Sequence, residues 1–130
     1  MPRPEGYRFL KSHEWARIDD DGEHAWIGIS DHAVKQLSDL VFLDLPDVGQ
    51  DIMQGEPFGE IESVKSVFDL YAPLTGEVIE RNEKLMDDLD ILKKDPWKEG
   101  WMLKIRMEKP SEFDNLLDRE AYAAALKAEG

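Results

Sequence analysis

Short apolar runs separated by turn-forming residues dominate this chain and constrain its fold more than any other feature. Glycine, proline, aspartate and asparagine cluster between the runs, which is typical of tight connections between β-strands. About seven short strands with little helix predict a mainly β fold, an antiparallel sandwich or a flattened barrel. The runs with strand character are His24–Ile29, Leu40–Leu45, Glu56–Glu62, Val67–Ala72, Gly76–Arg81 and Trp101–Met107.

Two of these runs support finer predictions about which side chains are buried. Leu40–Leu45 is almost entirely apolar and ends at Pro46, which predicts a strand that is buried on both faces. Trp101–Met107 alternates, so its odd-numbered residues are expected on one face and its even-numbered residues on the other. The cluster Asp19–Gly22 falls short of a calcium-binding loop and predicts a hairpin turn instead.

Helix is expected at the edges of the β core. Ser30 or Asp31 is suited to cap a short helix that runs to about Leu37. We expect this helix and the C-terminal segment to pack on one domain that spans residues 1–130, a length sufficient to bury a core.

The C-terminal segment, about residues 111–130, is the strongest helical stretch. Ser111 is predicted to cap a helix over 112–117, and Asp118 a second, alanine-rich helix over 119–129. Tyr122 and Leu126 lie one turn apart and are expected to dock the second helix on the sheet.

Charge and composition narrow the possible functions. The chain has 16 basic and 29 acidic residues, a net charge of −13, which disfavours binding to nucleic acid or to an anionic membrane surface. It has no cysteine, which excludes disulfides, thiolate metal sites and cysteine catalysis. His13, His24 and His32 are not at metal-ligand spacing, so no metal site is expected. The four tryptophans are expected to be packing residues and not a ligand cage.

Targeting signals are not evident in the sequence. No apolar run approaches the ~20 residues that a membrane-spanning helix needs. The first ten residues show neither the apolar core of a signal peptide nor the pattern of a transit peptide. A cytoplasmic location is expected, or the mitochondrial matrix if a presequence has been removed.

The segment from Gly59 to Val78 carries the candidate functional residue. The pattern predicts a strand, a tight turn that bears Lys65, a return strand, a Pro/Gly turn and a further strand. A lysine at such a tip is usually only a solvated residue that discourages edge pairing. The turn would nevertheless project its amine into water on a rigid support.

The residues around this lysine resemble a known modification motif. Glu62-Ser63-Val64-Lys65-Ser66, followed by residues 69–78, is similar to the lipoylation motif of the glycine cleavage H-protein family. Biotinyl domains have Met-Lys-Met at this point, and the lipoyl domains of 2-oxo-acid dehydrogenases have Asp-Lys-Ala. Further segments that resemble the family are 12–15, 27–33, 41–46, 48–49, 95–96, 100–101, 116–118 and 120–122.

The resemblance implies a fold, a cofactor and a set of partners. The fold would be a lipoyl-domain-like flattened β barrel or sandwich (a barrel-sandwich hybrid). Lipoic acid would be held as an amide on Lys65 and would shuttle the aminomethyl group of glycine. The partners would be the pyridoxal-phosphate-dependent glycine decarboxylase, an aminomethyltransferase, dihydrolipoyl dehydrogenase, and a lipoate ligase or lipoyl transferase. The chain itself would be a carrier and not an enzyme.

A second hypothesis concerns where the arm rests. The amine that it carries is expected to be cationic, so a nearby carboxylate would favour it. Glu14 and Asp69 are the candidate carboxylates, and the Ser12 hydroxyl is a further candidate contact. The alternative is that both are ordinary surface or turn carboxylates.

Several positions depart from the family pattern and leave a second function open. Leu37-Ser38-Asp39 replaces the usual Leu-Gly-Asp, Trp97-Lys98 the usual Tyr-Gly, and Phe68 stands where small or polar residues are common. If the family's glycine has a positive φ at this position, the backbone of Ser38 would be strained in the same conformation. The alternative function is an H-protein-like lipoyl carrier of another pathway, either heterodisulfide-reductase-like sulfur oxidation or lipoate relay.

Overall fold

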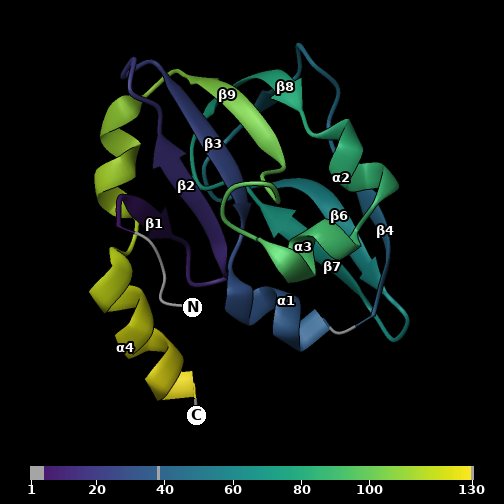
Figure 1. The fold of residues 1–130 in the computed structure, drawn as a ribbon. Coiled ribbons are helices and arrows are strands. Elements are labelled where there is room, and N and C mark those ends of the chain that lie inside the picture. Colours follow the sequence, from purple (N-terminus) through teal and green to yellow (C-terminus); the bar gives the residue numbers. More distant parts are fainter. Residues whose placement is uncertain (1–4, 38, 130) are drawn as a thin grey trace.

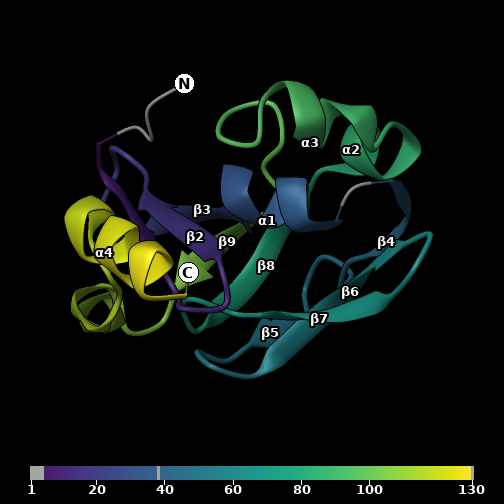
Figure 2. The same ribbon diagram turned by 90° about the horizontal axis from the view of Figure 1, so that it is seen from below.

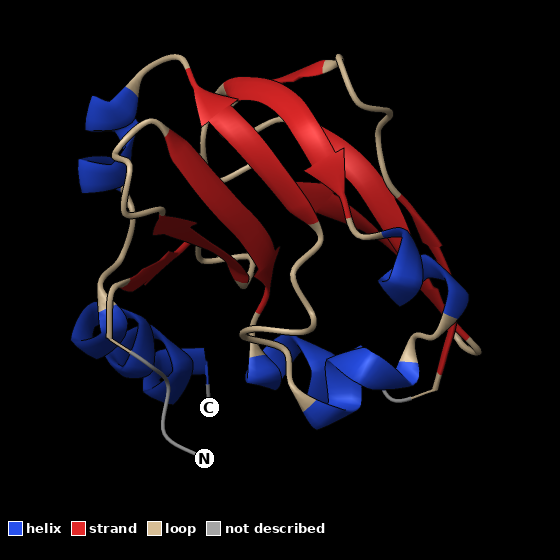
Figure 3. Cartoon of the chain, turned by 45° about the horizontal axis from the view of Figure 1, so that its top comes forward, coloured by secondary structure: helices blue, strands red, loops and turns tan. Residues whose placement is uncertain are grey.

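Two antiparallel sheets with helices along their edges make up the molecule (Figures 1 and 3). The computed structural model describes residues 5–37 and 39–129, so the question of strain at Ser38 lies outside the described residues. The strands are β1 (Tyr7–Phe9), β2 (Glu14–Ile18), β3 (His24–Ile29), β4 (Leu40–Asp44), β5 (Asp51–Ile52), β6 (Pro57–Ser63), β7 (Val67–Tyr71), β8 (Gly76–Arg81) and β9 (Leu103–Met107). The helices are α1 (Asp31–Leu37), α2 (Glu83–Asp87), α3 (Asp90–Lys94), the 3₁₀ helix η1 (Pro110–Asn115) and α4 (Arg119–Glu129).

The larger sheet has six strands in the order β1-β2-β3-β9-β8-β5. The turn between β2 and β3 is the predicted hairpin turn at Asp19–Gly22. Gly22 has φ +73°, a conformation that glycine adopts without steric cost. The smaller sheet has three strands in the order β4-β6-β7. Neither sheet closes on itself, so the predicted mainly β fold is confirmed in its open, sandwich-like form.

Burial on β4 differs from the sequence-based prediction. Val41 and Phe42 are exposed, whereas Leu43 is buried, so the prediction that Leu40–Leu45 is covered on both faces is wrong. The physical reason is that β4 packs against the core with one face only, so the side chains on its other face are not covered. A register shift between Leu40 and Phe42 places two consecutive side chains outward.

The strand β9 also begins later than expected. Leu103, Ile105 and Met107 are buried, as the alternation predicted. Met102 is fully buried too, contrary to its predicted place on the opposite face, because it precedes the strand. Its backbone N–H donates to the carbonyl of Ile27 in a connection outside the regular ladder.

The core has two parts. The larger part fills the space between the two sheets and includes Ile27, Leu43, Ile61, Leu74 and Ile105. A second, aromatic part lies at the β1 edge of the large sheet. Its members are Tyr7, Phe9, Trp15, Trp97 and Tyr122, with Trp26 and Trp101 packed against it. The tryptophans are therefore packing residues, as the sequence predicted.

The helix ends match two of the three predicted caps. The Ser30 hydroxyl accepts a hydrogen bond from the N–H of Ala33 at 3.2 Å and caps α1. Asp118 accepts from the N–H of Ala121 at 2.8 Å and caps α4. The prediction for Ser111 is wrong, because the 3₁₀ helix begins at Pro110 and places Ser111 inside it. The rigid φ of proline suits it to that first position.

Several elements were not expected from the sequence. They are the strands β1, β2 and β5 and the short helices α2 and α3. None is longer than 5 residues, which is too short to show a clear apolar period. Among the described helices, none has the length and apolar character needed to cross a membrane.

Candidate functional site

Lys65 lies at the tip of the β6–β7 hairpin. The turn is closed by Ser63, whose N–H donates to the Ser66 carbonyl at 2.8 Å and whose hydroxyl accepts from the Ser66 N–H at 3.2 Å. The N–H of Val64 donates to the Asp39 carbonyl at 3.0 Å, which ties the turn to the start of β4. These bonds give the two serines of the motif a structural role, because they fix the backbone on either side of the lysine.

The side chain of Lys65 is exposed, as are its two neighbours. Five of the seven large apolar side chains that are exposed among residues 5–37 and 39–129 gather on this hairpin and on β4 beside it. We call them the tip patch: Val41, Phe42, Val64, Val67 and Phe68. Soluble proteins seldom leave so many apolar side chains together in water without an interaction that uses them.

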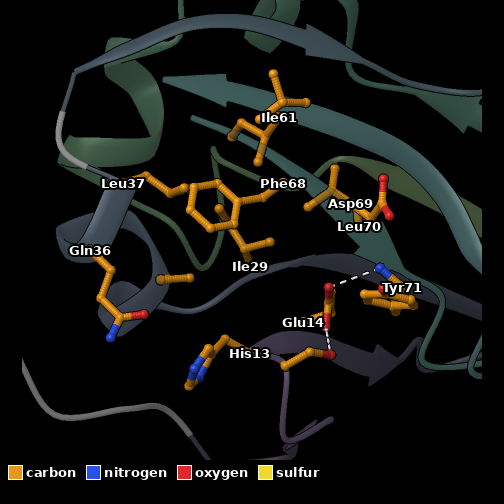
Figure 4. Close-up of a pocket in the computed structure, with 13 residues that line it drawn as sticks. His13, Glu14, Ile29, Gln36, Leu37, Ile61, Phe68, Asp69, Leu70 and Tyr71 are labelled. Atoms are coloured by element: carbon orange, nitrogen blue, oxygen red, sulfur yellow. Dashed lines mark hydrogen bonds between the residues drawn. The ribbon is translucent and has the colours of Figure 1, made fainter. Parts of the chain in front are cut away.

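A cleft opens beside the hairpin, between the two sheets (Figure 4). Its cavity has a volume of about 310 Å³ and is lined by the start of β2, one face of α1 and the length of β7. Figure 4 shows the Phe68 ring lying near Leu37 and Ile29 at its apolar end, with Glu14 at the opposite, polar end. Val67 lines both this cleft and the shallow depression around Lys65, so the cleft begins next to the lysine.

Glu14 is the most unusual ionisable group of the cleft. It is only 2% exposed. The Ser12 hydroxyl donates to one carboxylate oxygen, and the N–H of Tyr71 donates to the other at 2.8 Å. Burial raises the pKa of Glu14 to about 7, although these hydrogen bonds act in the opposite direction. The carboxyl group is therefore poised to lose its proton when a cation enters the cleft near neutral pH.

The cleft brings together the three residues predicted to contact the arm. Ser12, Glu14 and Asp69 all line it, although Ser12 and Asp69 are 57 residues apart in the chain. Glu14 is not a surface carboxylate, which excludes that alternative for this residue. Asp69 is exposed at the rim of the cleft, as an ordinary surface carboxylate would be.

Sequence reasoning missed two features of this region. One is the apolar end of the cleft, where Phe68 meets Leu37 of α1; a helix–hairpin contact has no local sequence signal. The other is the approach of His13, His32 and Glu129, whose ligand atoms lie within 4.8 Å of one another.

Comparison with known proteins identifies the family. The family model described as "Glycine cleavage H-protein" matches residues 7–129. The glycine cleavage system H protein of Synechococcus sp. (strain CC9605) is 49% identical over 125 residues, 96% of this chain and 95% of that protein. The one from Vibrio campbellii is 46% identical over 122 residues, 94% and 96% of the two chains.

A solved structure supports the same family. The crystal structure of a glycine cleavage system H protein from Mycobacterium marinum superimposes with a TM-score of 0.87 at 33% identity, covering 96% of this chain and 99% of that one. These comparisons confirm the family and the carrier role in glycine cleavage that the sequence resemblance implied: the chain belongs to the glycine cleavage H-protein family.

Proposed function

We propose that residues 1–130 act as one carrier domain, that lipoic acid is attached to the amine of Lys65, and that the loaded arm rests in the cleft between the sheets. The observation that carries the proposal is the exposed lysine on a hydrogen-bonded hairpin tip, directly beside an apolar cleft with a buried carboxylate. When attached, lipoic acid supplies the disulfide that accepts the aminomethyl group of glycine. Once that group has been passed on, the cofactor is left as a dithiol, which dihydrolipoyl dehydrogenase would oxidise back to the disulfide. The chain supplies position and access and is not itself an enzyme.

The residues of the site fit such a group. The exposed Lys65 amine is open to a lipoate ligase or lipoyl transferase, and no described side chain forms a salt bridge with it. Asp69 is four residues further along the chain, a path of about 13 Å at about 3.3 Å per residue in a strand. An extended lipoyl-lysine is long enough to reach it. The apolar lining near Phe68 suits the hydrocarbon part of the arm, since burial of CH₂ groups there is favourable.

The polar end of the cleft suits a cationic amine. Glu14 ionises more readily when a positive charge lies next to it, because the charge offsets the desolvation that raises its pKa. Ser12 and the Tyr71 N–H hold both carboxylate oxygens in place for that contact. Asp69 at the rim adds a second negative charge on the path of the arm. A carboxylate paired with the amine would slow its escape to water.

The proposed partners follow from the same chemistry. They are the glycine decarboxylase, the aminomethyltransferase, dihydrolipoyl dehydrogenase and the lipoylating enzyme. The tip patch provides apolar contact around Lys65, and the net charge of −13 favours fast encounter with basic surfaces. We place the protein in the cytoplasm.

A coupled assay tests the proposal. The full chain is lipoylated with a lipoate ligase and mixed with glycine decarboxylase, and the exchange of labelled bicarbonate into glycine is followed. The wild type is expected to support exchange, and Lys65→Arg to support none, because arginine cannot form the amide. Lys84→Arg, an exposed lysine on α2, is the matched control and should behave as the wild type.

Two results would contradict the proposal. If Lys65→Arg were lipoylated and active, the attachment site would be elsewhere. If the lipoylated wild type supported no exchange although a known H-protein did so under the same conditions, the carrier would serve a different pathway, such as sulfur oxidation or lipoate relay.

A further inference from the structure

Three metal-ligating side chains from distant segments meet next to the cleft. His13 lies in the turn between β1 and β2, His32 in the first turn of α1, and Glu129 at the end of α4 (Figure 2). His13 Nε2 lies 3.8 Å from one carboxylate oxygen of Glu129, and His32 Nε2 lies 3.9 Å from the other. The carboxylate therefore bridges the two imidazoles from one side.

The donor set is suited to a zinc-like ion. Two imidazoles and one carboxylate form a set of three protein ligands that zinc sites use, with a fourth position left for water. Zinc–ligand bonds of about 2.0–2.2 Å in a tetrahedral site separate neighbouring ligand atoms by about 3.4 Å. The observed separations of 3.8 and 3.9 Å run to different oxygens of Glu129. With one ligand atom from each residue, the three atoms lie within 4.8 Å of one another, so the side chains would rotate inward to bind an ion.

A second layer of hydrogen bonds orients one of the imidazoles. His13 Nδ1 lies 2.7 Å from the Tyr122 hydroxyl, which lies 2.7 Å from the Ser30 hydroxyl. A proton on Nδ1 that is donated to Tyr122 leaves the lone pair of Nε2 directed at Glu129. Histidines that bind metals are commonly fixed by such a bond from the other ring nitrogen. Tyr122 is fully buried, so this support is rigid.

His32 provides an independent observation. Its Nε2 atom is buried and has no hydrogen-bond partner in the part of the chain that the structure describes. Buried polar atoms are normally satisfied, so an unsatisfied one needs an explanation. A metal ion between His32 and Glu129 would satisfy this atom and would also bring the acidic chain a favourable positive charge.

A second cluster, Asp19, Asp21 and His24, is a structural turn and serves as a contrast. Asp21 accepts hydrogen bonds from His24 and from the N–H groups of Glu23 and His24, which lower its pKa to about 2. Asp19 is paired with Lys104 at 3.7 Å. The ligand atoms of this second cluster therefore already form hydrogen bonds or ion pairs with neighbouring residues.

We propose that His13, His32 and Glu129 bind one Zn²⁺ ion. This reverses the expectation drawn from the spacing of the histidines, because the fold supplies the proximity that the sequence does not display. The ion would join the end of α4 to α1 and to the turn that carries Ser12 and Glu14, and so would stiffen one wall of the cleft. Zinc binding at this site would be separate from the carrier function and would not depend on it.

The test uses an untagged full chain that carries Lys65→Arg, so that no lipoyl dithiol can bind the metal. Zn²⁺ is titrated by calorimetry, and Co²⁺ is added as a spectroscopic probe of ligand geometry. We expect one ion per chain, a rise in Tm and a tetrahedral Co²⁺ spectrum. In this background His32→Gln and Glu129→Gln should abolish binding, whereas His24→Gln, the same change in the hairpin cluster, should not alter it.

A conservative variant separates orientation from ligation. Tyr122→Phe keeps the buried ring and removes only the hydroxyl that holds His13, so it should weaken the affinity for Zn²⁺ by about 10- to 100-fold. Circular dichroism without metal verifies the fold of each variant. Glu129→Gln changes an exposed residue at the end of α4, so this variant tests the site even if His32→Gln does not fold. The proposal would be overturned if the Lys65→Arg chain, with all three ligands intact, did not bind Zn²⁺. Loss of binding in His24→Gln, or unchanged binding in both His32→Gln and Glu129→Gln, would also overturn it. The exchange assay with lipoylated protein would be unaffected by that failure.

Discussion

The two sheets of this protein differ in what they do with their apolar side chains. In the six-stranded sheet, Phe9 on β1 is fully buried and stacks on Tyr122 with ring centroids 4.1 Å apart. In the three-stranded sheet, Phe42 on β4 is 56% exposed and lies next to the register shift in that strand. The same residue type stabilises the fold in one sheet and remains available at the surface in the other. The exposed apolar side chains of the small sheet form a surface suited to interaction, whereas its buried side chains, such as Leu43 and Ile61, share the core between the two sheets.

The largest expected effect tests this contrast with one substitution made in both sheets. Phe9→Ala should lower the free energy of unfolding by about 3–5 kcal/mol, because it removes a buried ring and leaves a cavity. Phe42→Ala should change it by less than about 0.5 kcal/mol, since the ring is largely in water already. Urea denaturation measures both. Exchange with glycine decarboxylase should slow for lipoylated Phe42→Ala if the tip patch contacts the partner. Equal destabilisation by the two variants would refute the contrast.

The strands β4 and β6 of the small sheet nevertheless pack closely, and a substitution at Gly59 tests how closely. A Cβ added to Gly59 would lie 2.2 Å from the backbone carbonyl oxygen of Asp44, so β4 and β6 would have to separate. We expect Gly59→Ala to lower the free energy of unfolding by about 2–4 kcal/mol, within the range of overpacking at a backbone contact. Glu60→Ala, at the next and exposed position, is the control. A fully stable Gly59→Ala would mean that the hairpin is not held rigidly.

The junction between the sheets should respond to pH through Glu14. Its folded pKa of about 7 lies above the ordinary value of 4.5, so its contribution to stability is fully present below pH 4.5 and is lost as the pH rises through 7. Between pH 4.5 and 8 the wild type should lose about 2–3 kcal/mol relative to Glu14→Gln, which does not titrate. Denaturation at several pH values measures this difference. A constant difference would show that the buried carboxyl does not titrate in this range; Glu56→Gln, an exposed carboxyl, controls for the substitution.

The smallest expected effect concerns the exposed rim of the cleft. Asp69→Asn should speed the hydrolysis of the aminomethylated arm by about two- to fivefold, the range expected for one exposed charge pair of up to about 1 kcal/mol. Asp44→Asn, an exposed aspartate on β4 away from the cleft, should leave the rate unchanged. Equal rates for Asp69→Asn and the wild type would assign Asp69 to the ordinary surface.

The sequence predicted what is local and missed what depends on long-range packing. Alternation and turn residues located six strands, and capping residues located α1 and α4, because these signals act over a few residues. The resemblance singled out Lys65 because its motif is continuous in the chain. The exposure of Val41 and Phe42 could not be predicted, because apolar composition does not tell a strand covered on one face from a strand covered on both.

The environment of the candidate residues was equally invisible in the sequence. Glu14 was a candidate for its charge alone, and its burial follows from the approach of β7, which is 57 residues away at Tyr71. His13, His32 and Glu129 show no spacing that suggests a cluster, since α4 brings the last of them back to the start of the chain.

The proposed function depends on attachment of the cofactor to the exposed amine of Lys65. The most direct test is to incubate the full chain with a lipoate ligase and to locate the added mass by peptide mass spectrometry. We expect one lipoyl group, on the peptide that contains Lys65, and none on Lys65→Arg. A lipoyl group on another lysine, or an unmodified Lys65 under conditions that fully lipoylate a known H-protein, would contradict it.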